Sequence, residues 1–277
     1  MKIKKIITVL LLLSLPFVCF ANDIPDLYRT QLFTYGGLPI AQKTGPQFKI
    51  LVNIGYAVGY SEDLKNPLWA VYRLGNKKTD SVQEWERPWN FVVDIRTDSR
   101  VTHDDYESSG YDRGHMVPNA AILEQYGQMA QLETYLITNV CLQTPGLNRG
   151  IWETLEAKIK DEISQDDTTN KQVHSVYVIT GPIFKKNPPD RLNSGIAIPD
   201  EFYTIISFQK GYLSTMKAVS FIFPQVLQGN NFMNYVTTID EIERVTGLEF
   251  FPELSVAKQK NLESKKRWFD LTELPAN

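Results

Sequence analysis

Residues 108–119 read Ser108-Ser-Gly-Tyr-Asp-Arg-Gly-His-Met-Val-Pro-Asn119 and lie between a polar loop and a pattern with helical spacing. Over four positions the stretch combines a carboxylate, a permanent cation and an imidazole, from Asp112, Arg113 and His115. Histidine titrates near neutral pH and is the usual general base of enzymes. Gly114 lets the backbone approach a ligand or turn tightly. The stretch predicts a catalytic loop, and the alternative is a structural turn in which Asp112 pairs with Arg113.

The other two of the three histidines, His103 and His174, stand among polar residues. Side chains in such segments are mostly exposed, so we expect both to lie in surface loops. His115 is then the candidate for a general base.

Residues 151–163 have the pattern of an amphipathic helix. Its apolar stripe consists of Trp152, Leu155, Ile159 and Ile163. Two polar candidates, Asn148 and Glu156, lie eight positions apart, which on a helix separates them by about 80°. The alternatives are structural roles: Asn148 as a helix N-cap, and Glu156 in an ion pair with Lys160.

Apolar runs predict strands elsewhere in the chain. These runs are at 48–60, 69–74, 136–141, 175–180, 201–208 and 216–223. The first two are expected to form a hairpin across 61–67, and Gly181-Pro182 is expected to end the fourth. Helical spacing predicts further helices at 120–135 and at 239–246, the latter with Gly247 as C-cap.

No repeat or linker divides residues 35–255, so we expect one domain over 22–277. Residues 22–48 are predicted to be an arm on the surface, 75–111 to be mainly loop, and the tail after Pro252 to be peripheral. The order of strands and helices predicts an α+β fold.

The N-terminus reads Met-Lys-Ile-Lys-Lys and then stays apolar up to Phe20. Basic residues, a short apolar run and a small residue at Ala21 are the layout of a secretory signal peptide. Residues 1–21 are therefore predicted to be removed, and the mature protein to be periplasmic or secreted and not membrane-bound. An uncleaved anchor is one alternative, although a span needs about 20 apolar residues. A lipid on Cys19 is another, although Pro16-Phe17-Val18 lacks the small residues of such a site.

Charge and cysteine content restrict the chemistry. The formal net charge is −3, whereas proteins that bind nucleic acid by neutralising phosphates are usually basic. Any contact with nucleic acid must therefore rest on a local basic cleft. Cys141 is the one cysteine beyond the predicted signal and is expected to be a small buried apolar residue. The sequence has no Cys/His cluster of the kind that zinc requires.

Asp112-Arg-Gly-His115 resembles the signature of the DNA/RNA non-specific endonuclease family, the ββα-metal nucleases. Further blocks resemble this family in the same order along roughly residues 35–255. They are Leu51–Tyr60, Trp69–Leu74, Thr138–Gln143, Gly146–Glu156, Val178–Phe184 and Ile239–Phe251. The resemblance implies an α+β fold with a mixed, mainly antiparallel central sheet flanked by helices, and a ββα-metal motif at the active site.

The resemblance also assigns roles. His115 matches the general base, and Asn148 the side chain that binds the metal directly. Glu156 matches the acid that supports the water ligands of the metal. Arg113 matches the signature arginine, and Asn139 an auxiliary active-site asparagine.

Two substrate-binding residues are implied as well. Arg87 is the candidate for an upstream phosphate-binding arginine, although its flanking spacing fits poorly. Lys160 stands where some relatives have an arginine, which keeps the charge and loses the bidentate fork.

The resemblance implies a metal-dependent enzyme that hydrolyses phosphodiester bonds of DNA and RNA without sequence specificity. The expected cofactor is Mg²⁺, with Mn²⁺ as a substitute, because Mg²⁺ keeps much of its water and needs few protein ligands. DNA and RNA are the expected partners, and a homodimer is the alternative to a monomer. Two other functions fit the scaffold: a phosphodiesterase acting on small nucleotides, and a non-catalytic nucleic-acid-binding protein.

Overall fold

The computed structural model describes residues 23–75, 88–164, 173–210 and 215–267. The predicted signal peptide and Arg87 lie outside the described residues. Among those residues, no helix has the length and apolar character that crossing a membrane requires.

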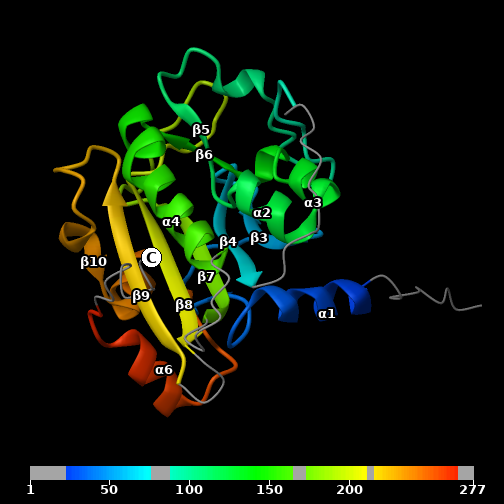
Figure 1. The fold of residues 1–277 in the computed structure, drawn as a ribbon. Helices are drawn as coiled ribbons and strands as arrows, with labels where there is room; N and C mark the ends of the chain where they lie inside the picture. Colours follow the sequence, from blue (N-terminus) through cyan, green and yellow to red (C-terminus); the bar gives the residue numbers. More distant parts are fainter. Residues whose placement is uncertain (1–22, 76–87, 165–172, 211–214, 268–277) are drawn as a thin grey trace, which may run out of the picture.

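A sheet of seven strands forms the centre of the protein (Figure 1), in the order β10-β9-β8-β7-β4-β3-β2. Every neighbouring pair in it is antiparallel. The strands are β2 (Lys49–Val52), β3 (Tyr56–Ser61), β4 (Asn66–Gly75), β7 (Val173–Ile183), β8 (Glu201–Lys210), β9 (Lys217–Pro224) and β10 (Val236–Thr237). Helices cover the sheet, so the predicted α+β fold with a mainly antiparallel sheet is confirmed.

Two strand predictions need correction. The apolar run at 48–60 is two strands, because Asn53 N–H bonds to Tyr56 O (2.8 Å) in a turn that packs on α2. A Cβ on Gly55 would lie 2.9 Å from the Tyr126 ring. The strand at 175–180 runs on through Gly181-Pro182. The pairing of β7 with β4 ends at Thr180. Beyond it this side of β7 is an edge of the sheet, where proline is tolerated.

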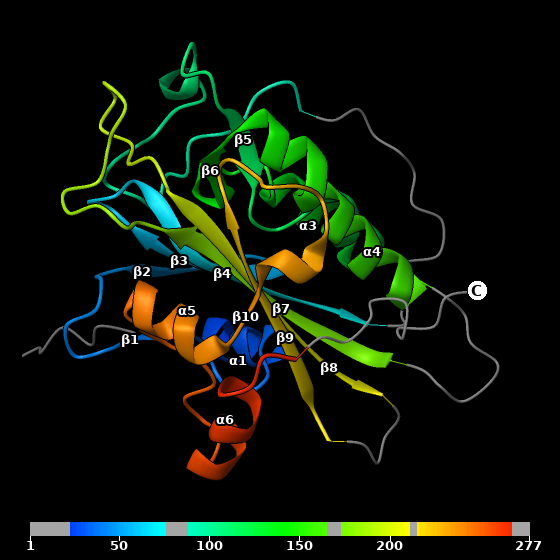
Figure 2. The ribbon, with the colours of Figure 1, turned by 90° about the vertical axis from the view of Figure 1, so that its left-hand side faces the viewer.

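One face of the sheet carries the elements of the candidate site (Figure 2). These are α2 (Asn119–Tyr126), α3 (Gln128–Glu133), α4 (Glu153–Ser164) and the hairpin of β5 (Asp112–His115) with β6 (Val140–Gln143). The predicted stripe is confirmed at Trp152, Leu155 and Ile159, which are buried in the core on this face. Cys141 is free and buried in the same core, as predicted.

Two further predictions on this face are only partly right. The helix predicted at 120–135 is divided into α2 and α3 at Gly127, whose φ is +82°. The strand predicted at 136–141 begins as a 3-10 turn, η2 (Ile137–Asn139), and becomes β6 only from Val140.

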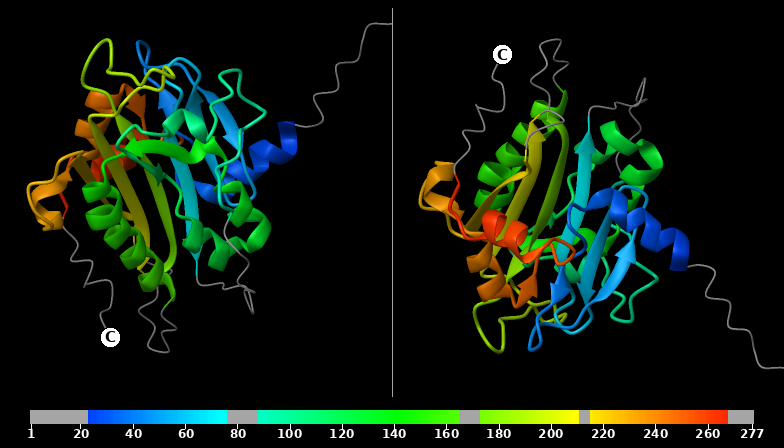
Figure 3. Two further views of the ribbon diagram at one scale, coloured as in Figure 1. Left: turned by 90° about the horizontal axis from the view of Figure 1, so that it is seen from above. Right: turned by 90° about the horizontal axis from the view of Figure 1, so that it is seen from below.

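The opposite face carries α1 (Asp23–Phe33), α5 (Ile239–Thr246), α6 (Val256–Glu263) and the small ladder of β1 (Ile40–Ala41) with β11 (Leu248–Glu249). Seen from below, α1 and α6 lie in front of the sheet (Figure 3). The predicted helix at 239–246 is confirmed, and Gly247 ends it with a left-handed φ of +70°. The predicted arm and tail instead contain α1 and α6, which bury Phe33 and Leu262 in a second core.

Candidate active site

The hairpin β5–β6 and helix α4 bring the candidate residues together. β5 pairs antiparallel with β6, with His115 opposite Val140 and Asp112 opposite Gln143. The chain then passes through one π-helical segment, η3 (Leu147–Trp152), into α4. Residues of β5, of α2 and of the segment from η3 into α4 line a pocket of about 430 Å³. Its polar lining consists of His115, Asn119, Tyr135, Asn148, Arg149, Glu153, Glu156 and Lys160.

Gly114 is required by the packing inside this hairpin. A Cβ at this position would lie 1.9 Å from Gln143 Oε1. Gln143 is fully buried, so its side chain has no room to move aside. The glycine of the signature thus lets β5 lie against a buried glutamine of β6, a contact that the sequence did not predict.

Aromatic rings hold the imidazole of His115. Its centroid lies 5.1 Å from that of Phe91, and Tyr135 meets it edge-on at 5.6 Å. Phe91 also stacks on His103, at 6.1 Å and 20°. Because rings packed on several sides restrict rotation, the His115 ring has a fixed orientation at the pocket wall.

His103 is less peripheral than predicted. It is half-buried, and its Nδ1 accepts a hydrogen bond from Phe91 N–H (3.2 Å). Its carbonyl oxygen accepts from the guanidinium of Arg113 (3.0 Å), which lies over the Tyr106 ring at 6.0 Å. Arg113 is not part of the pocket lining. In this structure it fastens β5 to the loop that carries His103.

Asp112 arranges the metal-ligand candidate. Its Oδ2 accepts from Asn148 Nδ2 (2.9 Å), and its two oxygens accept from Arg149 at 2.8 and 2.6 Å. Partial burial raises the pKa of Asp112, but the bonds from Arg149 and Asn148 outweigh it and lower that pKa overall. The alternative pairing with Arg113 is therefore wrong.

The bond to Asp112 fixes how the Asn148 amide is turned. With Nδ2 engaged, no described residue donates a hydrogen bond to its Oδ1, and the side chain lines the pocket. Asn148 lies inside η3, whose N-cap is Gly146, so the N-cap alternative is wrong. An amide oxygen presented to a pocket is a suitable ligand for a hard cation.

Glu156 faces the same pocket from the first turn of α4. It accepts a hydrogen bond from Trp152 Nε1 (2.9 Å). Burial raises its pKa to about 8; the bond from Trp152 opposes the shift and Glu153 adds to it. The alternative ion pair with Lys160 is wrong, because Lys160 Nζ pairs with Glu124 (3.2 Å). Lys160 still lines the pocket.

The raised pKa of Glu156 makes stability depend on pH. An unfolded glutamate titrates near pH 4.3, so from there to about pH 8 the folded chain holds a proton that the unfolded chain has lost. The contribution of Glu156 to the free energy of unfolding is fully present below the pKa of the unfolded glutamate. It is lost as the pH rises from there through the pKa of the folded one. In EDTA, we expect the melting temperature of the wild type to fall by roughly 3 °C more than that of Glu156→Gln between pH 5 and 8. An equal change of melting temperature with pH in the two proteins would contradict this assignment.

Asn139 holds the backbone next to the site. Its Oδ1 accepts from Val117 N–H (2.9 Å), and its Nδ2 donates to the carbonyls of Val117 (3.1 Å) and Thr134 (3.0 Å). The side chain is fully buried. It therefore positions the segment after His115 and is not among the described residues that line the pocket. The auxiliary active-site role that the resemblance implies stays a prediction.

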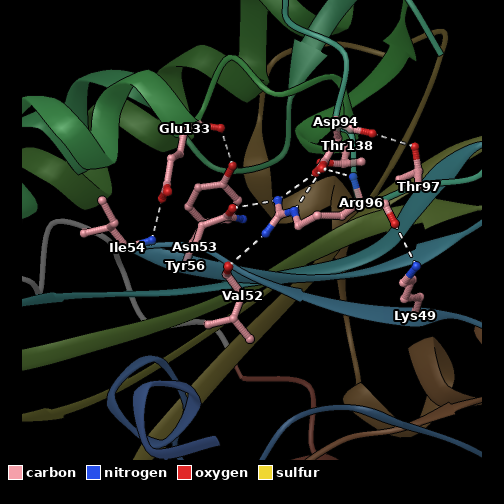
Figure 4. Close-up of polar contacts among 10 residues, drawn as sticks. All are labelled: Lys49, Val52, Asn53, Ile54, Tyr56, Asp94, Arg96, Thr97, Glu133 and Thr138. Carbon is pink, nitrogen blue, oxygen red and sulfur yellow. Dashed lines mark hydrogen bonds and ion pairs between the residues drawn. The ribbon is translucent and has the colours of Figure 1, made fainter. Parts of the chain in front are cut away.

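An ion pair between a buried carboxylate and a half-buried arginine lies within the loop region predicted for 75–111 (Figure 4). Asp94 is 1% exposed, and its Oδ2 accepts from Arg96 Nη2 (2.7 Å) and from Thr138 Oγ1 (2.8 Å). Arg96 also donates to Val52 O (3.0 Å) and Asn53 Oδ1 (2.9 Å) on the edge of the sheet. The pair links the loop that carries Phe91 to the sheet and to η2.

Comparisons with known proteins agree with this geometry. The model of the DNA/RNA non-specific endonuclease family matches residues 39–257. A nuclease of Syncephalastrum racemosum is 30% identical over 243 residues, 80% of this chain and 73% of its own. A nuclease of Nostoc sp. is 28% identical over 80% of each chain. Human mitochondrial endonuclease G is 27% identical over 72% of this chain and 68% of its own.

A solved structure also has a similar fold. It is the complex of EndoG with EndoGI, described as showing the mechanism of EndoG inhibition. The TM-score is 0.67 at 24% identity, over 84% of this chain and 94% of that one.

Proposed function

The chain belongs to the DNA/RNA non-specific endonuclease family, and from this premise we propose that it uses His115 as general base and Mg²⁺ held at Asn148. The family makes it a hydrolase with nucleic-acid substrates and a metal requirement. One observation carries the finer proposal: His115 from β5 and Asn148 and Glu156 from the helical segments line a single pocket.

The described residues of the pocket fit a hard cation better than zinc. The side-chain oxygens of the lining belong to the amides of Asn119 and Asn148, the carboxyls of Glu153 and Glu156 and the hydroxyl of Tyr135, and His115 is the one imidazole in it. Zinc prefers several nitrogen or sulfur ligands, whereas Mg²⁺ takes one or two protein oxygens and keeps its waters. When bound, Mg²⁺ would neutralise charge that develops on the scissile phosphate and the leaving oxygen.

The side chains of the protein supply the rest. The imidazole of His115, held by Phe91 and Tyr135, takes the proton of the attacking water. Lys160 and Arg149 place two cationic groups in the pocket lining. Each is paired with a carboxylate, and both are positioned to contact the phosphates of a substrate. Asp112 keeps the Asn148 amide turned to the pocket.

The experiment that tests this proposal is a cleavage assay with the metal removed and restored. We expect EDTA to abolish cleavage of both plasmid DNA and RNA by the wild type, and Mg²⁺ or Mn²⁺ to restore it, because no described side chain can replace the charge of the ion. Cleavage that continues in EDTA would overturn the metal part. Hydrolysis confined to short model diesters would favour the small-nucleotide alternative, and a lack of hydrolysis with any metal would favour a binding protein.

We also propose export, on the sequence pattern of residues 1–21. A nuclease without sequence specificity endangers its own cell, and removal to the periplasm or beyond avoids this. The N-terminal residue of the mature protein checks the proposal, since cleavage after Ala21 leaves Asn22 first. A mature protein that still begins at Met1 would contradict it. The homodimer stays a prediction.

A further inference from the structure

Three carboxylates meet on the face of the sheet opposite the nuclease pocket. Asp240 and Glu243 belong to α5, and Glu263 is the last residue of α6. One carboxylate oxygen from each lies within 4.8 Å of the other two. Figure 2 shows α5 and α6 on the side of the sheet away from α4. Like charges this close repel, so the arrangement needs a compensating interaction.

Glu263 is the most buried of the three carboxylates and depends most on such an interaction. Its residue is 6% exposed, and its Oε1 is buried without a hydrogen-bond donor among the described residues. No described basic side chain forms an ion pair with it. Burial, followed by Glu243, Glu249 and Asp240, raises the pKa of Glu263 to about 8. A buried carboxyl without a partner is costly, and bound cations are one of the ways in which proteins compensate such groups.

The other two carboxylates complete a possible coordination shell. Glu243 is half-buried, and its Oε1 accepts from Phe250 N–H (2.8 Å), which anchors the side chain. Burial raises its pKa to about 7, with contributions from Glu249 and Asp240. Asp240 is exposed in the first turn of α5. The cluster thus extends from a buried oxygen of Glu263 to the solvent-exposed Asp240, so an ion can reach it from solvent.

The spacing fits one cation. Oxygens bound to the same Ca²⁺ lie about 2.3–2.6 Å from it, so two of them are at most about 5 Å apart. Three carboxylates supply up to six oxygens, which suits the flexible, oxygen-rich shell of Ca²⁺. Mg²⁺ usually takes one or two carboxylates in a stricter octahedron, and zinc prefers nitrogen and sulfur.

We propose that Asp240, Glu243 and Glu263 form a Ca²⁺ site that fastens the C-terminal helix α6 to α5. The site is separate from the nuclease pocket, which lies across the sheet, and its role is structural. A cation bound to the folded chain alone raises stability in proportion to the logarithm of its concentration above the dissociation constant. Ca²⁺ therefore stabilises the packing of Leu262 and its neighbours in the second core.

Thermal melting of the full chain, stripped of metal with EDTA and desalted, tests the site. Ca²⁺ at a concentration about 100 times its dissociation constant is expected to raise the melting temperature of the wild type by roughly 5 °C or more. Glu263→Gln keeps the shape and removes a charge. We expect it to melt higher than the wild type at neutral pH without Ca²⁺, because the amide removes the cost of keeping a buried carboxyl protonated, and to lose the response to Ca²⁺. Calorimetric titration should show its Ca²⁺ affinity at least tenfold weaker.

Two control variants separate this site from other effects of the ion. Glu241→Gln alters a neighbouring carboxylate of α5 that pairs with Arg244, and it should keep the full response. Asn148→Ala removes the ligand candidate of the nuclease pocket and should keep it too. A wild type that does not respond to millimolar Ca²⁺, or a response that survives in Glu263→Gln, would overturn the proposal. If the wild type does not respond to Ca²⁺ and Glu263→Gln melts higher than the wild type, a proton alone stabilises the cluster.

Discussion

His115→Ala is expected to lower the rate of DNA and RNA cleavage by a factor of about 10²–10⁴, the usual contribution of a general base. His115 is the one histidine among the described residues that line the pocket, and Phe91 and Tyr135 hold its ring in place. The loss should therefore be similar for both nucleic acids and should appear in kcat. Initial rates of plasmid nicking and RNA hydrolysis in Mg²⁺ measure it.

Chemical rescue separates a lost base from a disturbed pocket. The alanine leaves a space between Phe91 and Tyr135 that has the size of an imidazole ring, so free imidazole should restore part of the activity of His115→Ala. The restored rate should rise with pH as imidazole loses its proton. Melting curves with and without Mg²⁺ show whether the variant folds and still responds to the ion. Cleavage by His115→Ala at the wild-type rate would refute the mechanism.

Much of the site followed from sequence because its parts carry recognisable local signals. The hairpin residue His115 and the helix residues Asn148 and Glu156 stand in ordered blocks, and the predicted helix stripe fixed which side of α4 is buried. Once these elements pack as two strands and a helix, the three side chains share a pocket. The resemblance to the family predicted that these three residues belong to one site, and helix periodicity alone had left structural roles open for Asn148 and Glu156.

The rest depends on contacts between segments that carry no local signal. Asp112 bonds to Asn148 and Arg149, and its side chain could as well have paired with Arg113 next to it. The side chain of Asn139 could equally have faced the substrate, and only the fold shows it bound to the backbone of Val117. The local sequence shows which hydrogen-bond and ion-pair partners a side chain could have, whereas tertiary packing determines which of them it contacts.

The helices α1 and α6 were missed for a related reason. Their sequences are polar with a few apolar residues, so a helix pattern is weak, and most of the stability of short helices comes from tertiary packing. Phe33 and Leu262 reach the second core only because the sheet offers an apolar face there.

Asn148→Ala is expected to reduce cleavage about as severely as the loss of His115, with a different signature. Removing the amide oxygen takes away the direct metal ligand, so the concentration of Mg²⁺ needed for half-maximal rate should rise at least tenfold. Added imidazole should not restore activity. Rates measured over a range of Mg²⁺ concentrations, alongside His115→Ala, distinguish the two defects, since His115→Ala should keep the wild-type Mg²⁺ requirement.

Asp112→Ala extends this test to the residue that turns the amide. Loss of the 2.9 Å bond from Asn148 Nδ2 frees the side chain to rotate, so the oxygen faces the pocket only part of the time. Groups that orient a metal ligand typically contribute 10–100-fold in affinity or activity, and we expect a raised Mg²⁺ requirement in that range. Arg149→Ala is the matched control for the Mg²⁺ requirement, because it removes the other partner of Asp112 and leaves the bond to Asn148. It should lower the cleavage rate, since Arg149 lines the pocket, and keep the wild-type Mg²⁺ requirement. If Asn148→Ala shows the wild-type Mg²⁺ requirement, Asn148 is not the ligand, and a shift in Asp112→Ala would then need a different cause.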